Sequence, residues 1–152
     1  MKDRRKFLKN AGSTALFASL GSSFFISCDD SEDNVTPPNT VPEDGYTSEG
    51  NVYTIYLDHP SFSLLASNGG WKMFNEGGML IVNVGQNIIR AFSNACPHAD
   101  CRTSWQYSNE NFTCTCHTSI FTNDGTRVSG PANQDLTSYS ASLKDNILTV
   151  TK

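Results

Sequence analysis

The chain lacks any extended helical pattern and any long uninterrupted hydrophobic run. Its 152 residues allow one domain and an appendage. No window of a dozen residues keeps the 3.6-residue periodicity of an amphipathic helix, so a helical domain is excluded. The longest apolar stretch, residues 11–27, is at the short limit for spanning a bilayer and is diluted by Ser and Gly.

Basic residues are scarce beyond the N-terminus. Of the 11 Lys and Arg residues, five lie in the first ten positions. Beyond residue 27, six basic side chains face fourteen of the chain's 15 acidic ones, a net charge of about −8. Nucleic-acid affinity depends on cations that neutralise phosphates, so this surface disfavours nucleic acid and anionic lipid. A basic protein is the better expectation for a partner.

The first 27 residues form a targeting segment in our interpretation. The stretch DRRKFLK carries a pair of arginines before the apolar run, and it resembles a bacterial twin-arginine export signal. That route exports folded proteins, which suits a protein that receives a cofactor in the cytoplasm. An ordinary signal peptide or a single membrane anchor is the alternative.

A cysteine ends this segment and an acidic linker follows it. FISC, ending at Cys28, resembles a relaxed lipobox, so we expect lipidation of Cys28 and tethering to a membrane. A lone thiol after an uncleaved anchor is the other reading. Residues 28–45 are acidic and rich in proline, with valine as their only large apolar residue, and we interpret them as a linker.

Residues 46–152 have the pattern of an antiparallel all-β domain. Short runs of β-branched and aromatic residues alternate with Gly, Asn and Asp turns. MLIVNV-GQN-IIRAF predicts one hairpin, and SYSASL-KDN-ILTVT predicts another at the C-terminus. The predicted strands cover residues 52–57, 62–66, 79–84, 88–92 and 147–151.

Cysteines and histidines gather in two short boxes, CPHADC (96–101) and CTCH (114–117). Five cysteines are an odd number for an exported protein, and a lipid on Cys28 leaves four. Those four could form two disulfides, which leaves both histidines unexplained. Zinc could take Cys and His ligands, but two of the six candidates would be surplus. An iron–sulfur cluster combined with one disulfide uses all six.

Cys96-x-His98 and Cys114-x-x-His117 together resemble the signature of Rieske proteins, and the resemblance extends over essentially all of 46–152. In that family two cysteines bind one iron of a [2Fe–2S] cluster and two histidines bind the other. The resemblance implies a Rieske-type fold with a cluster-binding subdomain of two loops and one cluster per chain, held by Cys96, His98, Cys114 and His117.

The same resemblance assigns roles to residues around the ligands. Cys101 and Cys116 match the disulfide of the high-potential branch, which serves quinol–cytochrome oxidoreductases and arsenite oxidase. Ser119 is expected to donate a hydrogen bond to a bridging sulfide. VSGPANQDLTSY (128–139) resembles the loop that covers the cluster, with Gly130 and Pro131 at its turn.

Four residues depart from the pattern of quinol-oxidising relatives. Phe121 replaces a tyrosine whose hydroxyl points at a ligand sulfur, so we expect a potential lowered within the high-potential class. Ala99 and Asp100 replace leucine and glycine at the exposed tip, which weakens the case for docking into a hydrophobic quinol pocket. Thr118 replaces a glycine, and a β-branched residue tolerates fewer backbone conformations there.

The expected function is that of a membrane-tethered periplasmic electron carrier, or a subunit of an oxidoreductase complex, with no catalytic residues of its own. Its partners would be redox proteins such as a c-type cytochrome or a quinol-oxidising complex. A Rieske oxygenase also needs an iron bound by two histidines and a carboxylate. Of the 3 histidines only His59 is uncommitted, which excludes an oxygenase catalytic subunit. A ferredoxin-like donor to an oxygenase is the alternative, disfavoured by the disulfide and the export signal.

Overall fold

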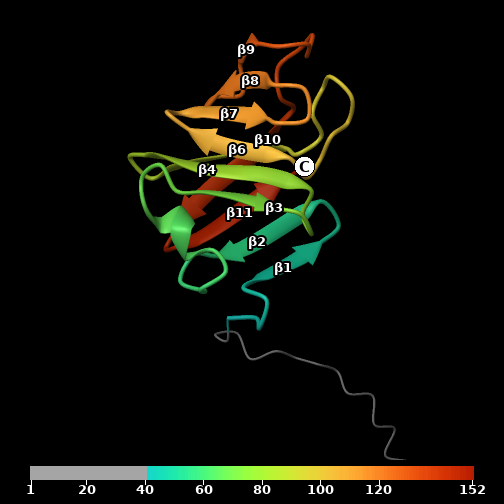
Figure 1. Cartoon of the computed structure of the whole chain (residues 1–152). Coiled ribbons are helices and arrows are strands. Elements are labelled where there is room, and N and C mark those ends of the chain that lie inside the picture. The colour runs from blue at the N-terminus through green and yellow to red at the C-terminus, as the bar shows by residue number, and fades with distance from the viewer. Residues whose placement is uncertain (1–40) are drawn as a thin grey trace, which may run out of the picture. The chain divides into compact units, whose positions relative to one another are not determined.

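A computed structural model describes residues 41–152, all of which lie in one compact unit. The predicted signal segment, Cys28 and all but the end of the linker lie outside the described residues. The described part contains eleven strands and one short 3₁₀ helix, η1 (Figure 1). Their bounds are β1 Tyr46–Glu49, β2 Val52–Tyr56, η1 Ser63–Ala66, β3 Trp71–Phe74, β4 Met79–Gly85, β5 Ile88–Ser93, β6 Trp105–Ser108, β7 Asn111–Cys114, β8 Ser119–Thr122, β9 Arg127–Ser129, β10 Ser138–Lys144 and β11 Ile147–Thr151.

The larger sheet is antiparallel and closes around the first hydrophobic core. Its seven strands follow the order β1-β2-β11-β10-β5-β4-β3. The outermost strands come together, because the rings of Tyr46 on β1 and Phe74 on β3 lie 4.8 Å apart. The core between them contains side chains from β2, β4, β5 and β11 and from η1. The all-β prediction is therefore confirmed.

Strand β4 serves two cores because both of its faces are buried. Met79 and Ile81 belong to the first core, whereas Leu80 and Val82 belong to a second one. Neighbouring side chains of a strand point to opposite faces, so a continuous apolar run indicates burial on both sides. The predicted hairpin of β4 and β5 forms, as does that of β10 and β11 at the C-terminus.

The smaller sheet carries the two cysteine–histidine boxes at one end. Its four strands follow the order β6-β7-β8-β9, and it packs beside β4 through the second core (Figure 1). Phe112 and Phe121, both 0% exposed, fill that core from the smaller sheet. The centres of the Phe92 and Phe112 rings lie 5.9 Å apart, which joins β5 to β7.

The predicted strand over residues 62–66 is wrong, because this segment forms η1. Phe62 and Leu65 are buried, whereas Leu64 between them is 69% exposed. This spacing of three residues suits one face of a 3₁₀ helix, in which side chains eclipse every third position. A strand would bury alternate residues instead. The peptide N–H of Leu65 accordingly donates to the carbonyl of Phe62 at 2.9 Å.

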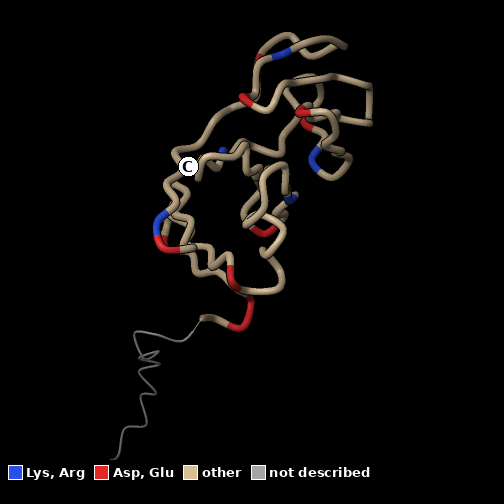
Figure 2. The backbone as a smooth tube through the Cα atoms, turned by 90° about the vertical axis from the view of Figure 1, so that its left-hand side faces the viewer, with Lys and Arg blue, Asp and Glu red and all other residues tan. Residues whose placement is uncertain are grey.

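Strands β1, β3 and β6 to β9 were not predicted. Each contains only three or four residues, and β9 is exposed along its whole length. Charged residues are scattered along the described backbone (Figure 2). Within residues 41–152, no helix has the length and apolar character needed to cross a bilayer.

Candidate metal centre

The pairing of three strands brings both boxes to the same end of the smaller sheet. Trp105 at the start of β6 pairs with Cys114 at the end of β7, and Cys114 also pairs with Ser119 at the start of β8. The loop before β6 (residues 94–104) and the loop between β7 and β8 (residues 115–118) must therefore meet. The resemblance to Rieske proteins implied two loops, and this register explains why they converge.

Two cysteines at this end are free and buried. Cys96 is 3% exposed and Cys114 is 1% exposed, and neither forms a disulfide. Burial, and then a hydrogen bond with the Cys96 thiol, raises the pKa of Cys114 to about 11. Without a metal the Cys114 thiol therefore keeps its proton at neutral pH. A metal that binds this residue as a thiolate must displace that proton.

The two histidines of the same boxes meet each other and are exposed. The Nδ1 atoms of His98 and His117 lie 3.2 Å apart, and their rings stand at 85°. Two nitrogens bound at about 2.1 Å to one tetrahedral metal would lie about 3.4 Å apart, close to the observed separation. Two soft sulfur donors and two imidazoles thus lie on the same pair of loops, a donor set that suits an iron–sulfur cluster.

A disulfide between Cys101 and Cys116 joins the two loops. The prediction of this pairing is confirmed. The sulfur atoms of both residues lie within 4.8 Å of that of Cys114. While the disulfide is intact they offer no thiolate to a metal, so the surplus cysteines of the boxes link the loops together.

Ser119 is fully buried and contacts the glycine–proline loop. Its Oγ accepts a hydrogen bond from the peptide N–H of Ala132 at 3.1 Å. Because the oxygen accepts this bond, its own hydrogen stays available to donate to another group. Gly130 has a φ of +91°, and a Cβ there would lie 2.6 Å from the Thr118 carbonyl oxygen. The loop containing Gly130 and Pro131 therefore lies directly on the second box.

Arg127 holds that loop in place, and sequence reasoning did not identify it. Its guanidinium donates to the carbonyl of Gly130 at 2.7 Å and also to that of Ala132. Its peptide N–H donates to the carboxylate of Asp135 at 2.7 Å. No local signal could have revealed this role, because it depends on the fold of the whole loop.

Both departures from glycine in the boxes adopt left-handed backbone conformations. The φ of Asp100 is 55° and that of Thr118 is 60°. Asp tolerates this region better than most residues, whereas a β-branched side chain is strongly disfavoured in it. The expectation that Thr118 constrains the loop thus has a specific cause. Its hydroxyl donates to the carbonyl of His117 at 2.7 Å.

Phe121 and Trp105 pack in the hydrophobic core that also contains the two free cysteines. Phe121 is 0% exposed, and its ring centre lies 5.8 Å from that of Trp105. Both belong to the hydrophobic core that contains Cys96 and Cys114. Phe121 and Ser119 are two residues apart on β8, so both side chains point to the same face of the strand.

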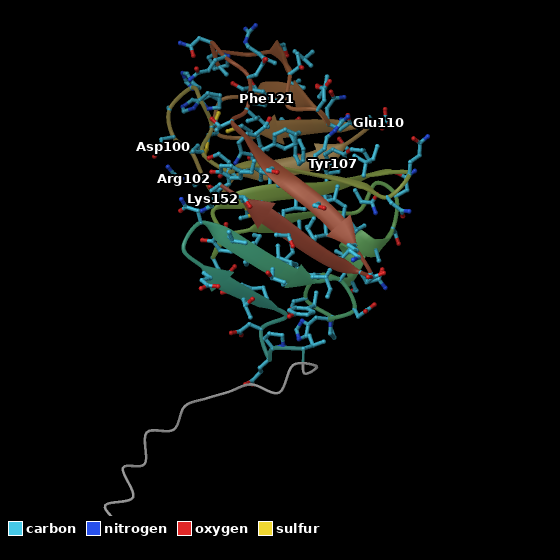
Figure 3. The ribbon with its side chains drawn as sticks, turned by 180° about the vertical axis from the view of Figure 1, so that it is seen from behind. Asp100, Arg102, Tyr107, Glu110, Phe121 and Lys152 are labelled. Atoms are coloured by element: carbon cyan, nitrogen blue, oxygen red, sulfur yellow. A yellow bond between two sulfur atoms is a disulfide. The ribbon has the colours of Figure 1, made fainter. Side chains whose placement is uncertain are left out.

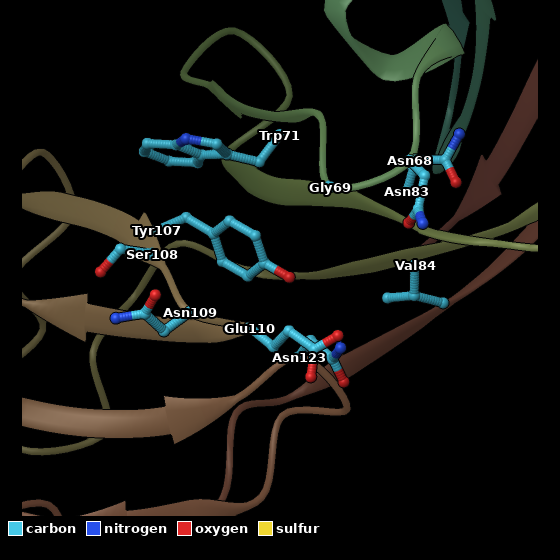
Figure 4. A pocket seen from close by; sticks show the side chains of 10 residues that line it. All are labelled: Asn68, Gly69, Trp71, Asn83, Val84, Tyr107, Ser108, Asn109, Glu110 and Asn123. Atoms are coloured by element: carbon cyan, nitrogen blue, oxygen red, sulfur yellow. The ribbon is translucent and has the colours of Figure 1, made fainter.

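A groove at the opposite end of the smaller sheet is separate from this centre (Figure 4). Its volume is about 320 Å³. Two of its amides are already engaged, since Asn83 donates to the Leu65 carbonyl at 2.8 Å and Asn123 accepts from Arg90 at 3.1 Å. The lining includes no cysteine or histidine and consists of Asn68, Gly69, Trp71, Asn83, Val84, Tyr107, Ser108, Asn109, Glu110 and Asn123.

Residues 49–140 match the family described as the Rieske [2Fe-2S] domain. The chain belongs to this family. The Rieske domain here holds a [2Fe–2S] cluster, and the protein is a Rieske electron-transfer protein. The resemblance noted in the sequence is confirmed.

Curated relatives support this assignment. The chain is 38% identical over 112 residues to the cytochrome b6-f complex iron-sulfur subunit of Cyanothece sp., covering 73% of this chain and 61% of the relative. It is 32% identical over 85 residues to the corresponding subunit of Chlorobaculum tepidum, covering 55% of this chain and 46% of the relative. The chain therefore spans about half the length of the curated relatives it matches.

The chain is also similar to two further proteins. A menaquinol:cytochrome c reductase iron-sulfur subunit of Geobacillus thermodenitrificans is 38% identical over 64 residues, covering 40% of this chain and 38% of the relative. Among solved structures, the plasma-membrane Rieske protein of Synechocystis PCC 6803 is 29% identical, with a TM-score of 0.46, and covers 54% of this chain and 84% of that chain.

Proposed function

We propose that Cys96 and Cys114 bind one iron of the [2Fe–2S] cluster and that His98 and His117 bind the other. The main support for this ligand assignment is that two buried free thiols and two neighbouring imidazoles lie on loops joined by a disulfide. The cluster supplies reversible one-electron chemistry. The surrounding residues position it, exclude water on the cysteine side and leave the histidine side open.

The exposed imidazoles would let electrons reach the cluster and would couple its reduction to proton binding. Both rings are exposed, so a redox partner can approach the iron through them. An imidazole that binds iron through one nitrogen presents the other to solvent, and oxidised iron makes that nitrogen more acidic. We therefore expect the midpoint potential to fall with rising pH above neutrality.

The potential depends on donors near the cluster sulfurs. Replacing two thiolates by neutral imidazoles raises the potential into a range of about −150 to +300 mV. Ser119 has a hydroxyl hydrogen available for a bridging sulfide, whereas Phe121 offers no donor. A Phe121→Tyr variant should therefore have a higher midpoint potential than the wild type. An unchanged potential would mean that the added hydroxyl reaches no ligand sulfur.

We assign the protein to the periplasmic face of a bacterial membrane, tethered through Cys28. The twin-arginine-like segment and the lipobox support this location. The relatives named as iron-sulfur subunits of the cytochrome b6-f complex and of menaquinol:cytochrome c reductase support a partner in an electron-transfer chain. The partner is then a quinol-oxidising complex or a cytochrome. The small, polar tip formed by Ala99 and Asp100 favours a protein partner over direct insertion into an apolar quinol pocket.

The ligand assignment is tested by replacing histidines singly. His98→Ala and His117→Ala should each abolish the EPR signal and visible absorbance of the cluster, with far-UV circular dichroism showing whether the fold persists. His59→Ala is the matched control, because His59 lies after β2 and its Nδ1 accepts from Ser61 N–H at 3.2 Å. Retention of an unaltered cluster in both site variants would refute the assignment.

The location is tested separately by Cys28→Ser in the full chain. We expect the wild type to fractionate with membranes and to incorporate labelled palmitate, and the variant to lose the label. Replacing Arg4 and Arg5 with lysine should leave the protein in the cytoplasm. Labelled Cys28→Ser protein, or normal export of the Lys-Lys variant, would contradict the proposed route.

A further inference from the structure

Asp100 and Arg102 form a bidentate ion pair at the first box, and a buried asparagine holds this pair in place. Arg102 Nη2 lies 2.7 Å from Asp100 Oδ1, and its Nε lies 3.3 Å from Oδ2. Arg102 Nη1 also donates to Asn94 Oδ1 at 3.5 Å. Asn94 is 3% exposed, and it is held by the indole of Trp105, which donates to its carbonyl at 2.9 Å.

The backbone ties this pair to the proposed ligands. The peptide N–H of Asp100 donates to the carbonyl of Cys96 at 2.8 Å, and that of Cys96 donates to the carbonyl of Cys101 at 3.0 Å. The turn that contains Cys96 and His98 is therefore closed at Asp100. Figure 3 shows Asp100 and Arg102 on the same side of the smaller sheet, away from Glu110.

We propose that Asp100 and Arg102 act on the redox potential of the cluster with opposite signs, so that each charge offsets the other. This inference rests on the proposed ligand assignment of Cys96 and His98. Reduction adds one negative charge to the cluster, so a nearby carboxylate disfavours it and a nearby guanidinium favours it. Held together, the two charges largely cancel at the cluster. Either one alone shifts the potential in its own direction.

The exposure of the pair distinguishes this role from a stabilising one. The Arg102 side chain is 51% exposed and that of Asp100 is 68% exposed. Exposed ion pairs contribute little to folding stability. Their field still reaches a centre within a few residues, and salt screens it, because the Debye length falls from about 30 Å at 0.01 M to about 3 Å at 1 M.

Lys152 is a further cation on this side of the domain, and it stays constant in the test. Its Nζ lies 5.0 Å from the ring centre of Tyr53 and 5.9 Å from that of Tyr139. Figure 3 shows it on the same side as Arg102. Its charge contributes equally to every variant, so it does not change the sign of their differences.

The test is the midpoint potential of the cluster-loaded full chain by voltammetry at low and high salt. Asp100→Asn should raise the potential, Arg102→Gln should lower it, and the double variant should return close to the wild type. Arg102→Lys should stay near the wild type, because it keeps the charge and loses only the bidentate geometry. All of these shifts should shrink as ionic strength rises from about 0.01 M to about 1 M.

Asp145→Asn is the matched control. Asp145 is also an exposed aspartate with a left-handed φ, 51°, in the hairpin turn after β10. That turn lies at the opposite end of β11 from Lys152, and five residues of strand extend for about 17 Å. Its removal should leave the potential unchanged. Asp100→Gly provides a second neutral variant whose backbone suits a positive φ.

The outcomes separate this proposal from the proposed function. Shifts of the midpoint potential that have the same sign in Asp100→Asn and Arg102→Gln, or that persist at high salt, would overturn the inference. They would mean that the ion pair only holds the structure of the loop. Wild-type potentials in every variant at low salt would overturn it too. A cluster that stays unaltered in both His98→Ala and His117→Ala would instead defeat the ligand assignment, whatever the charge variants do.

Discussion

The contact between the glycine–proline loop and the second box makes Gly130 the most sensitive position in the site. An alanine Cβ there would lie 2.5 Å from Ser119 Cα and 2.6 Å from the Thr118 carbonyl oxygen. Real Cβ atoms do not approach backbone atoms so closely, so the loop must move. The φ of +91° adds a second penalty, because alanine is strained in that region.

The size of the effect follows from these two terms. A left-handed conformation costs a non-glycine residue about 1–2 kcal/mol, and overpacking costs about 1–3 kcal/mol more. Gly130→Ala should therefore destabilise the domain by about 2–5 kcal/mol, a large share of the ~5–15 kcal/mol typical of a domain. At about 4 °C for each kcal/mol, its melting temperature should fall by about 8–20 °C.

Gly50→Ala is the control that isolates the steric term. Gly50 also has a positive φ, +57°, but no atom lies within 4 Å of an added Cβ. This variant should therefore lose only about 1–2 kcal/mol. Far-UV circular dichroism and visible absorbance should be followed together at one scan rate, because cluster loss makes unfolding irreversible. Equal losses in the two variants would refute the argument from close approach.

Three further predictions concern the same end of the sheet. Thr118→Gly should stabilise the domain by about 1 kcal/mol, because it relieves a left-handed β-branched residue, and a lower melting temperature would contradict this. Replacing Cys101 and Cys116 together by serine should cost about 3 kcal/mol for a loop of this length, measured by denaturant unfolding, and an unchanged midpoint would show that the disulfide adds no stability. In the cluster-free protein, the raised pKa of Cys114, about 11, means that the folded state holds its proton more tightly than the unfolded chain, whose thiol ionises near 8.5. The stability that Cys114 contributes should therefore be constant below about pH 8.5 and fall as pH rises towards 11, and Cys114→Ser should remove that part of the pH dependence.

Much of the fold could be predicted wherever local pattern and tertiary environment agree. The hairpin of β4 and β5 combines a continuous apolar run with a polar turn, and Gln86 and Asn87 have the positive φ values that such a turn requires. The strand predicted over residues 62–66 was wrong because a short apolar run fits a strand or a helix equally well. The strands of the smaller sheet were not predicted for another reason. They are very short, and much of their burial comes from the neighbouring sheet.

The types and spacing of the candidate ligands could be predicted from the two boxes, because the chemistry of thiols and imidazoles limits the metals they can bind. The pairing of Cys101 with Cys116 came from the resemblance to Rieske proteins, and the structure confirms it. The supporting contacts could not be predicted in the same way. Asn94, Arg102 and Arg127 act through hydrogen bonds whose partners depend on how loops return to the sheet. A single sequence carries no local pattern for such contacts.

The two replacements of glycine show where sequence and structure give different information. Sequence alone identifies Asp100 and Thr118 as replacements of glycine. The structure adds that both have a positive φ and that only Asp100 is compensated. Asp100 tolerates this region and has Arg102 as a partner, whereas Thr118 is β-branched and bonds only the carbonyl of its own neighbour. Glycine at 118 should therefore relieve strain, while glycine at 100 removes an ion pair and a charge. Thr118→Gly should thus change mainly the stability of the domain, whereas Asp100→Gly should change mainly the redox potential.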